Sequence, residues 1–577
     1  MNQSPSETFH RSFLEYLEAL PKAARWFWLL VIASGATAGL GAVGLLRLHH
    51  LVQQLVWPHG ATFIQSVAAA GVLRRILLPT SAGLLVVLVS QTTGRPLGGH
   101  GTAGIIEAIW HRSGQLRFAR SLMRGIISIL AVSLGASLGR EGALIQIGAA
   151  SSSKLAELTK LPPEHIRLLV ACGASAGIAA AYNVPIGGAL FGLEVLLGSF
   201  AFELFGPVVV SCVVATLISR TLLGSYPSYR VPSYVFMRPI ELLRALAVGP
   251  LLGLAAALFV RTIDSVAALC DRIPRSLSPL VPLFALALVG SASLGWPELL
   301  GNGYDTVDAA LLGRVSLHLA LLLPLLKLLA SALCAGAGVP GGLFTPSLFY
   351  GSLIGNALGQ LTQPLVGDSA PSGAFALLGM GAALAGTTHA PMTAVVMIFE
   401  LTGDYSLILP LMLTCTLSAA VSRRFEPDSL YTSALRRRNV QLPAMPRPEW
   451  LQRKPIHELI SASVESVPPS LPVREVILRL LDLPRGVDLY VVGEQQELLG
   501  VLHLEQLLRI PLSARAELAR ADEVMETRLT PLVLSMSLAE AAAQFASTEL
   551  EHLPVVGVAR QVVGTVSKNE VLRYGTF

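Results

Sequence analysis

Long apolar stretches alternate with short glycine- or proline-containing segments over the first 435 residues. The apolar pattern predicts membrane helices over Trp26–Leu46, Ile76–Val89, Leu122–Leu134, Val208–Ile218, Ala245–Val260, Leu280–Val289, Leu317–Leu333 and Leu407–Val421. Several are shorter than the roughly 20 residues that a straight membrane span needs. Broken helices are stable at membrane depth only where protein or a watery cavity covers the freed backbone groups. The pattern is therefore typical of a transporter.

An internal repeat supports this interpretation. The stretch Gly173–Glu194 resembles Gly381–Glu400, and each has a proline, Pro185 or Pro391, nine residues before the glutamate that closes an apolar helix. A glycine-rich motif precedes each stretch. Two such repeats predict an inverted-repeat transporter whose binding site lies at the interface of the repeats.

Composition separates a membrane part from a soluble part. The chain is 53% apolar and only 14% charged, whereas soluble domains average about 25% charged residues. Charged residues are concentrated after Arg436. We expect an N-terminal cytoplasmic or interfacial helix at 1–24, a membrane domain at 25–435, a linker at 436–455 and two soluble units at 456–515 and 516–577.

Charge and cysteine usage exclude some functions. The net charge of +5 has its excess in the membrane part, so it does not indicate nucleic-acid binding. The basic tract Arg436–Arg438 follows the last apolar run and predicts that this end is cytoplasmic. The five cysteines lie in apolar stretches without paired spacing, so we expect neither disulfides nor a metal site.

The soluble part repeats one α/β pattern. The first unit has predicted strands at Leu489–Val492 and Leu499–Leu502 and a helix from Leu504; the second has strands at Leu553–Val556 and Val562–Val566 and a helix from Lys568. This resembles a tandem cystathionine-β-synthase (CBS) pair, a regulatory module that in many proteins binds adenine nucleotides.

The resemblance makes adenine nucleotide a candidate ligand of the second unit. Many such modules carry a Gly-x-x-Ser/Thr-x-x-Asp signature, and the second unit has Gly564, Ser567 and Glu570 at those positions, with glutamate for aspartate. The first unit has His503 and Gln506 instead and lacks both key groups.

Three glycine-rich segments fit the requirements of an anion pore. An anion needs favourable dipoles without a deep trap of opposite charge, which helix N-termini supply, and glycine lets the backbone approach the ion closely. The segments are Gly99–Gly104 (GHGTAG), Gly139–Ala143 (GREGA) and Gly342–Pro346 (GLFTP).

In order along the chain, these segments resemble the GSGIP, GREGP and GxFxP motifs of the CLC chloride channels and transporters. Leu430-Tyr431 matches as well, and Ala180–Pro185 and Gly301–Tyr304 resemble the bacterial ClcB-like branch. The resemblance implies an all-α polytopic membrane domain, a CLC-type inverted repeat of broken helices, followed by an α/β tandem CBS domain. It also implies a homodimer in the bacterial inner membrane with both termini cytoplasmic. The implied partners are chloride ions and lipid, and neither enzymatic activity nor a required cofactor is expected.

The resemblance also assigns roles to residues. Glu141 would be the gating glutamate, whose carboxylate competes with chloride and leaves when protonated. The backbone amides of Leu343 and Phe344 and the hydroxyl of Tyr431 would bind the central anion. His100, Gly101, Arg140 and Gly142 complete the implied anion-binding set.

Elementary physics favours some of these roles and leaves others open. Glu141 beside Arg140 in an apolar span is costly, which favours a functional role for the glutamate. Arg140 could instead be only its structural partner, and Tyr431 could be an ordinary interfacial tyrosine.

Two departures from the family pattern affect function. His100 replaces the serine that helps to bind the anion, so side-chain coordination at that loop is in doubt. Val195 occupies the position where proton-exchanging members carry an inner glutamate. Because valine cannot relay a proton, the sequence favours a voltage- or proton-gated chloride channel over a proton–chloride exchanger. A CBS-regulated divalent-cation transporter is a more distant alternative.

Overall fold

The chain forms two compact units, Met1–Pro443 and Ala444–Phe577. The computed structural model describes residues 22–94, 97–98, 101–224, 229, 231–232, 234, 239–274, 276–365, 371–403, 405–440, 456–461, 464–483, 488–504, 507, 519–527, 529–546, 548, 550–557, 560–568 and 570–571. Most of the predicted N-terminal helix at 1–24 and most of the predicted linker at 436–455 lie outside these residues.

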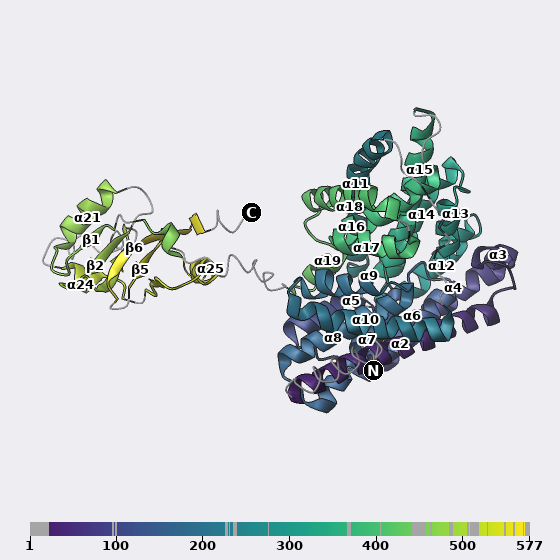
Figure 1. Cartoon of the computed structure of the whole chain (residues 1–577), viewed down its shortest axis with the longest axis horizontal. Helices are drawn as coiled ribbons and strands as arrows, with labels where there is room; N and C mark the ends of the chain where they lie inside the picture. The colour runs from purple at the N-terminus through teal and green to yellow at the C-terminus, as the bar shows by residue number, and fades with distance from the viewer. Residues whose placement is uncertain are drawn as a thin grey trace, which may run out of the picture. The chain divides into compact units, whose positions relative to one another are not determined.

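The first unit is a bundle of α-helices (Figure 1). Its first half contains α2 (Lys22–Val56), α3 (Phe63–Ala69), α4 (Val72–Thr93), α5 (Gly101–His111), α6 (Phe118–Ser133), α7 (Glu141–Thr159), α8 (Pro163–Tyr182), α9 (Pro185–Phe191) and α10 (Phe202–Leu223). Its second half contains α11 (Pro239–Asp271), α12 (Val281–Ala292), α13 (Tyr304–Leu311), α14 (Leu317–Gly336), α15 (Phe344–Thr362), α16 (Ser372–Thr388), α17 (Pro391–Thr402), α18 (Ile408–Phe425) and α19 (Leu430–Arg436).

The predicted apolar runs coincide with helices α2, α4, α6, α10, α11, α12, α14 and α18. Seven helical segments among the described residues are long and apolar enough to cross a membrane, and Pro185–Leu197, Ser278–Ala292, Ser372–Thr388 and Pro391–Thr402 are shorter apolar helices. The prediction of a polytopic membrane domain with broken helices is confirmed.

The two halves repeat one packing arrangement. In the first half α7 packs on α8, α8 on α10, and α10 on α2; in the second half α15 packs on α16, α16 on α18, and α18 on α11. Helices α9 and α17 contact each other, and they lie between the two groups in Figure 1. The predicted internal repeat is thus visible in the order of helix contacts.

Glycine lets the central helices of each half approach closely. A Cβ added at Gly148 of α7 would overlap the carbonyl of Gly173 in α8, and one at Gly355 of α15 would overlap the carbonyl of Phe375 in α16. Small residues at helix contacts are the usual way in which membrane helices pack tightly. As a result α16 is buried along nearly its whole length.

The second unit contains two three-stranded sheets, each with one parallel and one antiparallel strand pair. The elements are β1 (Ser466–Val467), α21 (Val473–Asp482), β2 (Leu489–Val492), β3 (Leu498–Leu502), α24 (Ala521–Val524), β4 (Leu532–Val533), α25 (Leu538–Ala546), β5 (His552–Val556) and β6 (Val562–Ser567). The four predicted strands are confirmed. Parts of the helices expected from Leu504 and from Lys568 lie outside the described residues.

Candidate anion-binding site

Three helix N-termini meet in the middle of the membrane unit. Helix α5 begins at Gly101, α7 at Glu141 and α15 at Phe344. A Cβ added at Gly101 would lie 3.0 Å from the Gly142 carbonyl oxygen, and one added at Gly142 would lie 3.2 Å from the Gly342 nitrogen. The first N–H groups of each helix have no intrahelical partner, so their positive helix ends point toward a common region.

A short backbone bridge joins the loops that precede α7 and α15. The N–H of Gly139 donates to the carbonyl of Gly342, and the N–H of Gly342 donates to the carbonyl of Gly139, both at 2.8 Å. The bridge connects the two repeats directly at the site. It fixes Glu141 and Phe344, the first residues of the two helices, relative to each other.

Glu141 is buried, with 1% of its surface exposed. Its Oε1 accepts a hydrogen bond from the Thr345 hydroxyl, and a Cβ added at Gly139 would overlap its Oε2. The carboxyl group thus folds back against the loop between the two helix ends. A side chain at position 139 would displace this carboxyl group from its position and lie 3.1 Å from the Thr345 hydroxyl oxygen.

The Arg140 guanidinium packs on the ring of Tyr304. Its guanidinium carbon lies 4.9 Å from the centre of the Tyr304 ring, which stacks on Tyr229 at 4.8 Å. No ion pair joins Arg140 and Glu141 among the side chains that the structure describes. The two residues are adjacent in sequence, but successive residues at the start of a helix face different directions, so adjacency does not make them partners.

Phe344 and Tyr431 both contact one aromatic side chain, that of Phe191. The ring centre of Phe191 is 6.5 Å from that of Phe344 and 6.3 Å from that of Tyr431. Leu343 directly precedes α15. Tyr431 is the second residue of α19, whose N-terminus is capped by Ser429 and Thr432. Phe191 therefore contacts both Phe344, the first residue of α15, and Tyr431 of α19.

His100 lies outside the described residues. Its neighbour Gly101 is described, and it opens α5 against the α7 loop. The contribution of the first glycine-rich segment is therefore described from Gly101 onward.

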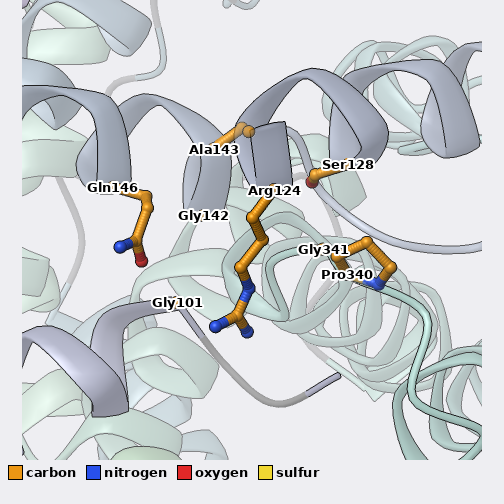
Figure 2. A pocket seen from close by; sticks show the side chains of 9 residues that line it. Gly101, Arg124, Ser128, Gly142, Ala143, Gln146, Pro340 and Gly341 are labelled. Atoms are coloured by element: carbon orange, nitrogen blue, oxygen red, sulfur yellow. The ribbon is translucent and has the colours of Figure 1, made fainter. Parts of the chain in front are cut away.

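A small, partly open pocket adjoins the convergence of the three helices. It is lined by Gly101, Arg124, Gly125, Ser128, Gly142, Ala143, Gln146, Pro340 and Gly341. Figure 2 shows the Arg124 side chain extending from α6 into the space between Gly101, Gly142 and Gly341. The Ser128 hydroxyl and the Gln146 Oε1 are buried there without a hydrogen-bond partner among the described residues.

Sequence reasoning missed Arg124, Thr345 and Phe191. The signal for Arg124 was available, because an arginine within the apolar run Leu122–Leu134 is costly unless it has a function. Thr345 stands inside the quoted motif, but no rule of spacing pairs it with a residue of another motif. Phe191 is one of many aromatic residues within the apolar segments of the sequence.

Val195 lies half-buried in an unexpected element. The segment Gly192–Leu197 is a π-helix rather than a continuation of α9, and it ends where Gly198 adopts a left-handed conformation with φ +60°. The Leu196 carbonyl accepts a hydrogen bond from the Trp110 indole at 3.1 Å. π-Helical turns occur frequently at functional sites, and this one carries both Glu194 and Val195.

Ser567 ends β6 and is half-buried, and Glu570 is exposed. In the first unit His503 follows β3, and its Nδ1 lies 2.8 Å from Asp488 Oδ1, with Glu526 Oε2 at 3.7 Å from its Nε2. Burial disfavours the charged imidazolium, but the hydrogen bond and charge of Asp488 and the charge of Glu526 outweigh it and raise the pKa of His503. The signature position therefore holds a serine hydroxyl in the second unit and an imidazole bonded to a carboxylate in the first unit.

The chain matches known families over most of its length. Residues 82–423 match the family described as voltage gated chloride channel, and residues 456–513 and 521–576 match the CBS domain. The chain is 37% identical over 416 residues to a chloride channel protein described as ClcB-like from Ralstonia nicotianae, an alignment that covers 70% of this chain and 96% of that one.

Two further relatives agree. The voltage-gated ClC-type chloride channel ClcB of Escherichia coli O81 is 35% identical over 411 residues, covering 68% of this chain and 95% of that one. A crystal structure described as a slow cyanobacterial Cl⁻/H⁺ antiporter is similar with a TM-score of 0.65 and 25% identity, covering 71% of this chain and 97% of that one.

Proposed function

This chain belongs to the voltage gated chloride channel family, and from that premise we propose that it is a gated chloride channel. Glu141 is the gate of this channel. The observation that carries the proposal is the meeting of three helix N-termini around a buried carboxylate. A region built to attract anions is then occupied by the protein's own negative charge when the gate is closed.

The anion site consists mainly of backbone. Its proposed ligands are the backbone N–H groups of Leu343, which precedes α15, and of Phe344, which begins it, together with the hydroxyl of Tyr431. Gly101 and Gly142 let α5 and α7 come close enough for their own N–H groups to contribute. Helix N-termini bind anions without a full opposing charge, so chloride can be bound and still leave. Arg124 and Arg140 add a positive potential nearby.

The gate works by competition and charge. An ionised Glu141 side chain occupies the region that the helix ends make favourable for anions. Protonation removes its charge, so the side chain loses this advantage and chloride takes its place. Flux should therefore rise as pH falls.

Two features favour a channel over coupled exchange. Val195 provides neither a proton donor nor an acceptor at the inner position. The neighbouring Glu194 is already bound: it accepts hydrogen bonds from the Thr393 N–H at 2.7 Å and from the Thr393 hydroxyl at 2.6 Å. A carboxylate committed to a helix end is poorly placed to carry protons.

Proton–chloride exchange is the second candidate, because a solved structure similar to this one is described as a Cl⁻/H⁺ antiporter. The deciding experiment loads proteoliposomes with a steep chloride gradient at equal pH and records the external pH during chloride efflux. A channel moves chloride without driving protons uphill. Uphill proton movement at a fixed ratio to chloride, lost in Glu141→Ala, would establish exchange instead. A divalent-cation transporter is disfavoured because positive helix ends repel cations.

The proposal includes a homodimer with one pore in each subunit. Large apolar side chains project from the segments that surround α9 and α17, among them Phe200 at 52%, Leu409 at 65% and Met412 at 52% exposed. The expected test is light scattering of the detergent-solubilised protein, in which Leu409→Asp with Met412→Asp yields the mass of a monomer. A wild-type protein with the mass of one chain would contradict the dimer.

The location follows from the same premise. We place the protein in the bacterial inner membrane with both termini cytoplasmic, because the basic tract 436–438 ends the membrane domain. Within that tract Arg436 pairs with Asp428 at 2.6 Å and Arg437 pairs with Asp264 at 3.2 Å. Labelling of a cysteine introduced next to this tract, in sealed spheroplasts, tests the orientation.

The CBS pair is proposed as the regulatory part. Ser567 and Glu570 are the candidate contacts to the ribose of an adenine nucleotide, in the second unit only. The first unit has histidine, His503, in place of the hydroxyl residue that such a contact requires, and its imidazole is bonded to Asp488. Calorimetric titration with ATP, ADP and AMP, using Ser567→Ala as the control, tests this proposal.

A further inference from the structure

One side chain holds the Glu141 carboxylate in place. The Thr345 hydroxyl donates a hydrogen bond to Glu141 Oε1, and Glu141 Oε2 is buried without any hydrogen-bond partner among the described residues. Thr345 is therefore the one hydrogen-bond donor to this carboxylate within the described part of the chain. It belongs to the opposite repeat, at the second position of α15.

The hydroxyl of Thr345 is itself held by Tyr182. The Tyr182 hydroxyl lies 2.9 Å from the Thr345 Oγ1. A threonine hydroxyl has a single proton, and that proton is directed to Glu141, so Tyr182 is the donor in the second bond. The result is a directed chain in which Tyr182 donates to Thr345, and Thr345 donates to Glu141.

The surroundings keep this chain rigid. Tyr182 is fully buried at the end of α8, and its ring centre is 5.4 Å from that of Phe344 and 6.5 Å from that of Tyr304. The backbone bridge between Gly139 and Gly342 fixes the two helix ends. Thr345 therefore meets Glu141 with its geometry already fixed. The other titratable groups that act electrostatically on Glu141 are the guanidinium of Arg140 and the phenols of Tyr229, Tyr304 and Tyr431, and the variants below keep all four.

We propose that Thr345 is the positioning residue that sets the pH at which the Glu141 gate opens, with Tyr182 as its support. The proposal rests on the proposed gating role of Glu141. Hydrogen bonds to an ionised carboxylate favour the charged form over the neutral one, and linked hydrogen bonds strengthen one another in a dry site. Thr345 and Tyr182 hold the gate closed until the solution is more acidic than it would otherwise need to be.

The experiment measures chloride efflux from proteoliposomes as a function of pH. Thr345→Val keeps the branched shape and removes the hydroxyl, so the midpoint of the flux–pH curve should shift to higher pH by about one unit. Thr345→Ser restores the hydroxyl and should return the midpoint toward that of the wild type. Tyr182→Phe should shift the midpoint in the same direction as Thr345→Val, but less.

A matched control is available in α16. Thr387 is a buried threonine whose hydroxyl donates to the Ala383 carbonyl at 2.8 Å. Thr387→Val should leave the midpoint unchanged. If Thr345→Val fails to fold, as judged by size exclusion, the Tyr182→Phe and Thr345→Ser curves decide the proposal.

The Glu141→Ala background separates this inference from the proposed function. Flux that still depends on pH in Glu141→Ala would overturn the gating role itself. If Glu141→Ala is independent of pH but neither Thr345→Val nor Tyr182→Phe moves the midpoint, the role of Thr345 is wrong and the gate stands. Thr345→Val added to Glu141→Ala should change nothing, and a changed flux there would show that Thr345 acts on the anion path instead.

Discussion

Glu194 follows α9 and caps the start of α17, while Glu400 lies near the end of α17 and caps the start of α9. Glu194 accepts the Thr393 N–H at 2.7 Å near the start of α17, and Glu400 accepts the Gly187 N–H at 2.6 Å near the start of α9. Each glutamate lies near the C-terminal end of its own segment and at the N-terminal end of the other segment. The two equivalent segments therefore run antiparallel. The reciprocal caps therefore show that the two repeats are inverted.

These caps should stabilise the fold. A carboxylate at a helix N-terminus is stabilised by the free N–H groups and by the helix dipole. Each of Glu194→Gln and Glu400→Gln should cost about 1 kcal/mol and lower the apparent melting temperature of the detergent-solubilised protein. Asp271→Asn, at the exposed last residue of α11, should not, because the dipole gives a carboxylate no stabilisation at a helix C-terminus. Equal melting temperatures in all three variants would contradict the capping role.

Removing the gate should uncouple flux from pH. In Glu141→Ala the helix ends no longer hold a competing carboxylate, so chloride flux at neutral pH should approach the acid maximum of the wild type. Efflux assays at a series of pH values test this. A Glu141→Ala protein whose flux rises with acid as steeply as the wild type would refute the assignment.

The membrane unit should bind chloride without the CBS pair. We predict that a chain ending at Val440 folds and binds chloride, because all the pore motifs precede that residue and Val440 itself packs against the membrane core. The CBS units have separate hydrophobic cores. Calorimetric titration with chloride is the measurement. Loss of binding in a monodisperse truncated protein would show that the tail does more than regulate.

His503 should make the first CBS unit more stable in acid. Asp488 and Glu526 raise the pKa of His503 in the folded state, so its contribution is full below the unfolded pKa of about 6.5 and is lost as pH rises through the folded value. His503→Asn should therefore lower the melting temperature of fragment 444–577 at about pH 5.5 and have little effect at about pH 8.5. The same loss at both pH values would exclude titration of His503 as the cause.

The sequence by itself determined the apolar runs that form eight of the helices and the segments that form the CBS strands, but it did not reveal the membrane-length helix α8. Membrane burial requires long apolar runs, and sheets require short β-branched ones, so both appear in a local window, as in Leu317–Leu333 and Leu489–Val492. The glycine-rich motifs also revealed where helix ends would approach an anion, because close backbone contact needs glycine.

Only the tertiary structure decided which partners those residues meet. Thr345 and Glu141 are 204 residues apart, and Glu194 and Thr393 are 199 apart. Their pairing depends on how tightly the glycine faces of α7, α8, α15 and α16 pack and on the bridge between Gly139 and Gly342. No local pattern contains that information, because a hydrogen bond across two repeats depends on the relative position of two helices rather than on the composition of either one.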